Sequence, residues 1–254
     1  MPIEYLGLSS INGPLIALEG VQDAFYDEIV EFIINGSERR IGRIIELYED
    51  KAVIQVFEGS ENMSLKNTHT RLTGRPMEIT LSKDMLGRTF NGIGQPIDDL
   101  GPIVSKLKRD VNGLPLNPVK REYPRNYIRT GISAIDGLTT LIRGQKLPIF
   151  SGNGLPHDQL AAQIVKQASL GEDSDEEFAI VFAAMGVKHD VADFFRRTFE
   201  ESGVADHVAM FLNLANDPVV ERLITPKVAL TVAEYLAFEQ NMHILVFLTD
   251  MTSF

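Results

Sequence analysis

The chain has 254 residues, 44% of them hydrophobic, which is enough for a sizeable core in one large domain or two smaller ones. Its net charge of −11 opposes binding to nucleic acid and to anionic membrane surfaces. The absence of cysteine excludes disulfides, thiol catalysis and thiolate metal sites, and it agrees with a cytosolic address.

The first 125 residues divide into two segments with different sequence patterns. Residues 1–72 alternate short β-rich runs with Gly, Asn and Ser turns, which predicts a small all-β barrel or sandwich. The pair Asn35-Gly36 is typical of a tight hairpin between two of these runs. Residues 73–125 are rich in Gly and Pro and weakly periodic, so we expect an extended linker that packs on its neighbours.

From residue 126 to 254, apolar runs alternate with amphipathic helical patterns. Because buried parallel strands read as nearly continuous apolar runs, this predicts a parallel sheet covered by helices on both faces. We therefore expect a mixed fold: a small N-terminal β-barrel, then a P-loop-type α/β domain with a mainly parallel sheet. Ligands in such sheets bind outside the carboxyl ends of the strands. The four expected strands are residues 146–151, 178–185, 207–215 and 243–250.

The stretch SGNGLPHD, residues 151–158, lies where a phosphate-binding P-loop would follow the first of these strands. The P-loop pattern G-x-x-x-x-G-K-[ST] supplies backbone N–H groups, a lysine and a hydroxyl to phosphates and Mg²⁺. Here Ser151 and Pro156 replace the two glycines, His157 replaces the lysine and Asp158 replaces the hydroxyl residue. All four defining positions therefore differ.

Each replacement weakens phosphate binding. Pro156 has no N–H, and His157 is mostly neutral at pH 7. Asp158 adds a negative charge, and its side chain can cap the following helix itself. The loop is about two charge units less attractive to phosphate, and one pair of charges at about 4 Å is worth roughly 4 kcal/mol at an effective dielectric of 20. We therefore expect no tightly bound nucleotide, although weak binding of ADP or ATP stays open.

Two further features of the sequence could bind a metal ion. The run 243–250 ends in Asp250, either as a Walker B aspartate that assists Mg²⁺ or as an ordinary turn residue. The pairs His157-Asp158 and His189-Asp190 could suggest a metal phosphohydrolase, but the chain has only five histidines. Because such a site needs more His and Asp ligands, we expect no metal site.

Four segments resemble the B subunit, or beta chain, of V/A-type ATP synthases, and the loop SGxGLPH is specific for it. They are TGISAID (130–136), RGQKLPIFSGNGLPHDQLAAQI (143–164), NLANDPVVERLITPKVALTVAEYLA (213–237) and LTDMTSF (248–254). A fifth, GRTFNGIGQPID (87–98), resembles the segment that joins the barrel to the nucleotide domain throughout the rotary ATPases. The resemblance covers the whole chain.

This resemblance implies a non-catalytic role. In the family, A and B subunits alternate in a hexamer, the A subunit carries the working P-loop, and B keeps the same fold as a regulatory member. Val187 stands where catalytic relatives place a glutamate base, so no catalytic residue is expected. The degenerate nucleotide-site residues are the loop backbone residues Gly152, Asn153 and Gly154, together with Lys188 at an arginine position, Arg222 and Asp250.

Arg222 matches a phosphate-binding arginine of catalytic relatives, although a salt bridge in the turn after Asp217-Pro218 is an equal alternative. Asp250 matches the Walker B aspartate. The implied partners are the catalytic A subunit, the central and peripheral stalk subunits and, indirectly, the membrane sector. The implied location is peripheral, on the cytoplasmic face of the membrane, without direct insertion.

The family's sequences continue past this point. They add the rest of the sheet, an arginine that reaches into the neighbouring A subunit and a C-terminal helical domain. We therefore expect this chain to be a fragment or a truncated product. The alternatives are a stand-alone binding module and an autonomous P-loop ATPase, which would need an intact G-K-[ST] and a glutamate base.

Overall fold

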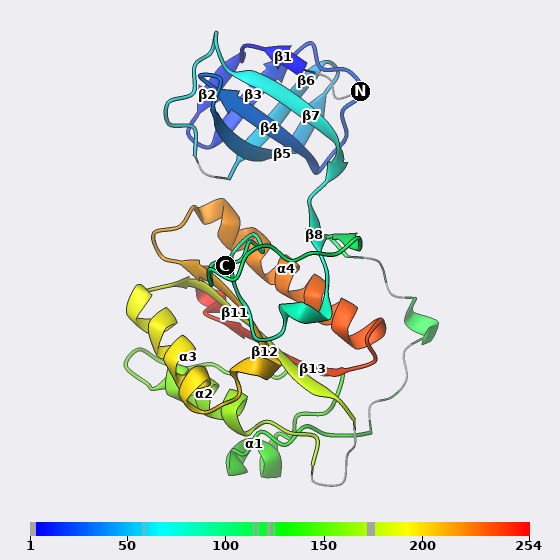
Figure 1. The fold of residues 1–254 in the computed structure, drawn as a ribbon, viewed down its shortest axis with the longest axis vertical. Helices are drawn as coiled ribbons and strands as arrows, with labels where there is room; N and C mark the ends of the chain where they lie inside the picture. Colours follow the sequence, from blue (N-terminus) through cyan, green and yellow to red (C-terminus); the bar gives the residue numbers. More distant parts are fainter. Residues whose placement is uncertain are drawn as a thin grey trace.

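The computed structural model describes residues 4–57, 59–113, 115, 117–120, 123, 125–171 and 176–254. Figure 1 shows a barrel-like N-terminal part and an α/β part, joined by the chain that leads from β7 into β8. The mixed fold predicted from the sequence is confirmed.

Seven antiparallel strands form the N-terminal sheet, in the order β1-β7-β4-β5-β6-β3-β2. Residues 4–12 close it, because β1 pairs with β7 at one edge and β2 pairs with β3 at the other. Gly7, at φ +87°, lies between the two pairings and donates its N–H to the Thr68 carbonyl. The sheet thus curls into a barrel. The strands are β1 (Glu4–Leu6), β2 (Ser10–Asn12), β3 (Leu15–Glu19), β4 (Glu28–Ile34), β5 (Glu38–Tyr48), β6 (Lys51–Val56) and β7 (His69–Pro76).

The predicted hairpin at Asn35-Gly36 is confirmed. Both residues have positive φ, +50° and +78°, and they connect β4 to β5 in a loop closed by the pair Ile34 and Glu38. Inside the barrel, Gly42 of β5 has no room for a side chain, because a Cβ would lie 2.9 Å from the Gln55 carbonyl oxygen. The barrel interior is therefore packed rather than hollow at this level.

The segment after the barrel contains short elements that the sequence pattern did not indicate. Strand β8 (Glu78–Thr80) pairs antiparallel with β10 (Lys108–Asp110), and β9 (Thr89–Asn91) pairs in parallel with β12 of the α/β sheet. Two single turns, η1 (Lys83–Met85) and η2 (Pro118–Lys120), also lie here. The linker between residues 73 and 125 thus contributes a strand to the neighbouring sheet, while the proposed division into three segments stays a prediction.

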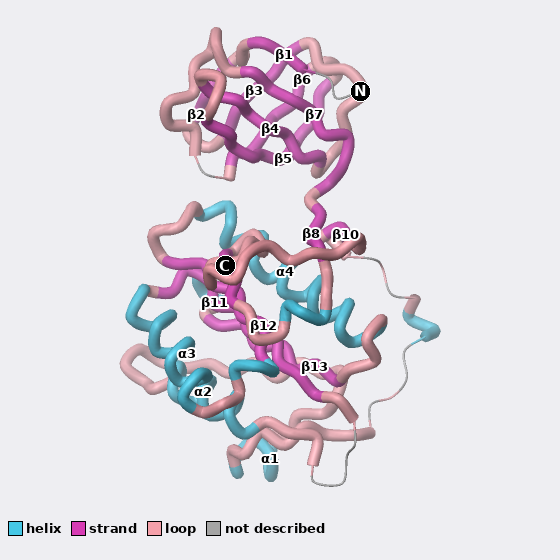
Figure 2. Tube along the Cα trace, viewed as in Figure 1, coloured by secondary structure: helices cyan, strands magenta, loops and turns pink. Residues whose placement is uncertain are grey.

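The α/β part has a four-stranded parallel sheet in the order β13-β11-β12-β9, with helices on both faces (Figure 2). Helices α2 and α3 pack on one face, and α4 packs on the other face together with the segment that follows the barrel. The elements are β11 (Phe178–Val187), β12 (Val208–Leu214), β13 (His243–Thr249), α1 (Ser133–Leu138), α2 (His157–Gln167), α3 (His189–Glu201), α4 (Val219–Phe238), η3 (Ala205–His207) and η4 (Met251–Ser253).

The expected strand at residues 146–151 is wrong, because this run is irregular in the structure. Its side chains face solvent: Ile149 is 46% exposed and Phe150 is 93% exposed. A strand needs a neighbour for its N–H and C=O groups, and no described strand runs beside this segment. The fourth strand of the sheet is β9 instead.

Within the described part of the chain, no helix combines the length and the hydropathy that a bilayer span requires.

Candidate functional site

The three long parallel strands end at one edge of the sheet. Val187 of β11 lies opposite Leu214 of β12, and Ala184 lies opposite Thr249 of β13. Lys188 and Asp250 therefore follow neighbouring strands at the carboxyl edge, which is where ligands bind in parallel α/β sheets. Lys188 is exposed.

The degenerate loop leads into helix α2. Residues 151–157 are exposed, and Gly154 has φ +82°. The His157 Nδ1 atom lies 3.0 Å from the Leu155 carbonyl oxygen. Since a carbonyl can only accept, this hydrogen bond places the ring proton on Nδ1. The imidazole is thus bonded to its own loop.

The helix cap differs from the sequence interpretation. Helix α2 begins at His157, and Pro156 occupies the N-cap position without a side-chain cap. Asp158 lies within the first turn, two positions past the N-cap residue. Its carboxylate is 3.7 Å from His157 Nε2. It still opposes a bound phosphate, because it places a negative charge at the positive end of the helix.

The contacts of Asp250 are those of a turn residue. Its carboxylate accepts hydrogen bonds from the hydroxyl groups of Thr252 and Ser253 in η4, the latter at 3.0 Å. In the described ranges, no group of three His, Asp or Glu side chains is arranged to hold a metal ion. The carboxylate is therefore engaged within its own turn.

Arg222, in the first turn of α4, donates through Nε to Asn213 Oδ1 at 3.2 Å. The same oxygen accepts the Gly186 N–H at 3.1 Å. Asp217 does not pair with Arg222, because its carboxylate accepts the Leu214 N–H at 2.7 Å. In place of the salt bridge that the sequence offered as an alternative, Arg222 donates a hydrogen bond to the buried amide of Asn213.

The sequence analysis did not identify Asn213. It is 0% exposed and is the next-to-last residue of an otherwise apolar strand, β12. A polar residue at the carboxyl end of a buried strand was the available signal. Among the described residues, no hydrogen bond or ion pair joins the loop at 151–158 to Lys188, Arg222 or Asp250.

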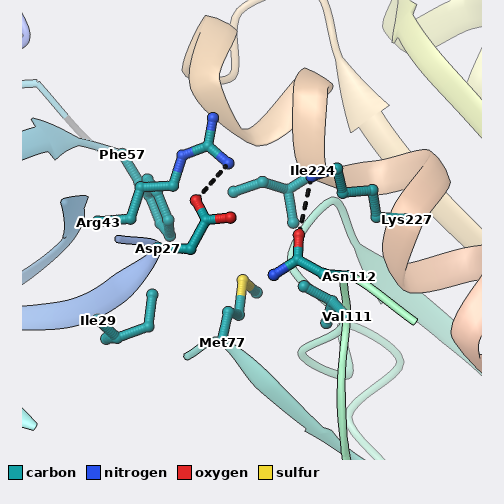
Figure 3. A pocket seen from close by; sticks show the side chains of 9 residues that line it. All are labelled: Asp27, Ile29, Arg43, Phe57, Met77, Val111, Asn112, Ile224 and Lys227. Carbon is teal, nitrogen blue, oxygen red and sulfur yellow. Dashed lines mark hydrogen bonds and ion pairs between the residues drawn. The ribbon is translucent and has the colours of Figure 1, made fainter. Parts of the chain in front are cut away.

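A small cavity lies elsewhere, between the barrel and α4 (Figure 3). Arg43 reaches Asp27 at 3.7 Å on its barrel side, and Lys227 donates to Asn112 Oδ1 at 2.9 Å on its α4 side. Its volume of about 10 Å³ suits one water molecule and no nucleotide. The cavity is part of the contact between the two halves of the protein.

Comparison with known proteins gives matches along most of the chain. The model described as "ATP synthase alpha/beta family, beta-barrel domain" matches residues 8–73, and that described as "ATP synthase alpha/beta family, nucleotide-binding domain" matches residues 131–254.

Three curated proteins are similar over 99% of this chain. The V-type ATP synthase beta chain 2 of Clostridium tetani is 61% identical over 252 residues, which is 55% of its length. The V-type ATP synthase beta chains of Halothermothrix orenii and Thermotoga neapolitana are 59% and 55% identical over 251 residues, 54% of each. The chain therefore spans about half the length of these relatives.

Proposed function

The chain belongs to the ATP synthase alpha/beta family, and from this premise we propose that it acts as the non-catalytic, regulatory B subunit in the peripheral sector of a V/A-type rotary ATPase. In this role it forms the interface with a catalytic A subunit and couples ATP synthesis or hydrolysis to transport of H⁺ or Na⁺. It works at the cytoplasmic face of the membrane, with stalk subunits as further partners.

The observation that carries the non-catalytic assignment is the loop at 151–158. It has His157 in place of the lysine that reaches the outer phosphates and Asp158 in place of the hydroxyl residue that holds Mg²⁺. The imidazole of His157 is bonded to Leu155, and Asp158 adds negative charge at the helix start. Val187 also offers no group that could orient or deprotonate water. An autonomous P-loop ATPase is disfavoured on the same grounds.

Assembly tests the role directly. We expect the protein, produced at the length that its gene encodes, to join the P-loop-bearing A subunit of the same source in a hexamer of alternating composition. Native mass spectrometry of the co-expressed subunits gives the stoichiometry. A B-type chain that remains apart from the A subunit, and stays a stable monomer, would contradict the proposal and favour a stand-alone binding module.

The loop chemistry is tested by titrating Mg-ADP and Mg-ATP into the protein by calorimetry. We expect no binding in the micromolar range, because micromolar affinity amounts to only about −8 kcal/mol and the charge deficit is of that order. The double variant His157→Lys, Asp158→Thr adds the missing positive charge and removes the negative one. Its affinity for Mg-ADP and Mg-ATP should therefore rise at least about tenfold.

The control for the gain is a charge-matched variant on the barrel, His69→Lys, Asp50→Thr, in which both side chains are exposed. It should bind no better than the unmodified protein. Micromolar binding by the unmodified protein would instead identify the loop as a nucleotide sensor and refute the electrostatic argument.

A further inference from the structure

We propose that one ordered water molecule lies in the cavity between the barrel and α4 and fixes the two halves of the protein against each other. The water bridges the Arg43–Asp27 pair of the barrel to Asn112, which is bonded to Lys227 of α4 (Figure 3). The inference goes beyond the proposed function, because it concerns the fold of this chain and holds whichever partners the subunit has.

The contact between the two halves is mostly apolar. The barrel is connected to the α/β part by the chain that leads from β7 into β8, so noncovalent contacts must set its orientation (Figure 1). Phe57 of the barrel and Ile224 of α4 are each 2% exposed, and they share one core cluster with Ile29 and Val111. The same four side chains line the cavity. The polar groups at the cavity are therefore set within an apolar contact.

The Arg43 guanidinium has few partners for a side chain that is only 21% exposed. Nη1 lies 3.7 Å from the Asp27 carboxylate, which is beyond hydrogen-bond distance, and Nη2 donates to Gln55 Oε1 at 3.4 Å, near the limit. Nε is buried and has no hydrogen-bond partner among the described residues. Because a buried donor without an acceptor is unfavourable, this nitrogen needs a specific explanation.

Asn112 presents an acceptor on the other side of the cavity. Its Nδ2 donates to Asp110 Oδ1 at 3.0 Å, and its Oδ1 accepts from Lys227 Nζ at 2.9 Å. These two bonds fix the orientation of the amide, with the oxygen toward the lysine of α4. An amide oxygen has two lone pairs, so Oδ1 can accept one more hydrogen bond.

One water molecule satisfies these groups together. It accepts a hydrogen bond from the Arg43 Nε–H and donates its two hydrogens to the Asp27 carboxylate and to Asn112 Oδ1. The cavity volume of about 10 Å³ is close to the smallest that holds a water molecule, and about three partners are usual for a buried water. The separation of Arg43 and Asp27 is also one at which a bridging water is expected.

The first test is a crystal structure of the protein, produced at the length that its gene encodes, at a resolution that shows ordered water. We expect one water peak within hydrogen-bond distance of Arg43 Nε, the Asp27 carboxylate and Asn112 Oδ1. The variant Asn112→Leu should lose this peak, because it removes one of the three partners. Since Asn112 is exposed, its replacement should leave the fold intact.

The second test is a double-mutant cycle between Arg43 and Asn112, measured by urea denaturation. Among the described residues, no hydrogen bond or ion pair joins these two side chains, so their replacements should be additive unless something lies between them. With a bridging water, Arg43→Met and Asn112→Leu should be coupled at least about fivefold in the equilibrium constant of unfolding. If Arg43→Met does not fold, Arg43→Lys replaces it, since lysine keeps the charge but has no Nε–H.

The control cycle pairs Asn112→Leu with Arg39→Met, which changes an exposed arginine on the same strand, β5. The two effects should be additive within about twofold.

Two results would overturn the inference. One is a crystal structure of the unmodified protein without a water peak at the cavity. The other is a water peak accompanied by additive effects at Arg43 and Asn112, which would show that the water fills the space without tying the two halves together. Neither result bears on assembly with an A subunit, and failed assembly does not affect these two tests.

Discussion

Replacing Phe182 by alanine should lower the free energy of unfolding by about 3–5 kcal/mol, the usual cost of removing a large buried aromatic ring. Phe182 lies in the middle of β11 and is 0% exposed. Its ring centroid is 4.6 Å from that of Phe195 and 5.3 Å from that of Phe199, both on α3. The variant therefore leaves a cavity between the sheet and the helix that covers it.

The measurement is urea denaturation followed by circular dichroism at the helical minimum, because the helices of the described chain all belong to the α/β part. Phe150→Ala is the matched control. Its ring is 93% exposed, so the same chemical change should cost no more than about 0.5 kcal/mol. Equal losses in the two variants would mean that the β11–α3 core does not limit stability.

The second large effect is expected at a largely buried ion pair that joins the residue before β9 to the loop after it. Arg88 binds Asp98 through two hydrogen bonds, Nε to Oδ2 at 2.5 Å and Nη2 to Oδ1 at 2.8 Å. The side chains are only 13% and 15% exposed. Asp98 also accepts the backbone N–H groups of Thr89 and Leu100. Asp98→Asn removes the negative charge beside the guanidinium, which keeps only its hydrogen bond to the Gly101 carbonyl, and should cost about 2 kcal/mol.

The control is Asp193→Asn, since Asp193 pairs with Arg196 at 2.8 Å on an exposed surface of α3. Exposed pairs of this kind contribute at most about 1 kcal/mol. Denaturation of both variants near neutral pH makes the comparison. If Asp98→Asn lowers the free energy of unfolding no more than Asp193→Asn does, burial of the Arg88–Asp98 pair adds nothing to its contribution to stability.

The pair also predicts a pH dependence. The hydrogen bond from Arg88 lowers the pKa of Asp98 from 3.8 to about 2, against the opposing effect of burial. Because the folded-state pKa is depressed, the stabilisation is complete above about pH 4 and is lost as the pH falls toward 2. It amounts to about 2 kcal/mol. The difference in stability between the unmodified protein and Asp98→Asn should therefore shrink over this pH interval.

The sequence predicted the features that depend on local pattern. Turn chemistry at Asn35-Gly36 indicated a hairpin, and short β-rich runs between closely spaced turns indicated a barrel or sandwich. Continuous apolar runs indicated β11, β12 and β13, because a strand covered on both faces needs apolar side chains on both. The replacement of the P-loop lysine by His157 and of its hydroxyl residue by Asp158 likewise follows from residue identity alone.

Tertiary structure decided which extended segments became strands. The run 146–151 is apolar enough for a strand but pairs with no strand of the described residues, whereas the three residues of β9 pair with β12. Hydrogen-bond partners in a parallel sheet come from distant parts of the chain, so a local pattern cannot reveal them.

The candidate site has one part that the sequence reveals, the loop at 151–158, and one part that depends on contacts between distant segments, the surroundings of Arg222. The sequence by itself determined the chemistry of the loop at 151–158, since a missing charge is missing in any conformation. The two hydrogen bonds that Asn213 Oδ1 accepts, from Arg222 and from Gly186, were decided only by the tertiary structure. The three residues lie on β11, β12 and α4, and only the pairing of the two strands and the packing of the helix on them bring one amide oxygen to two donors.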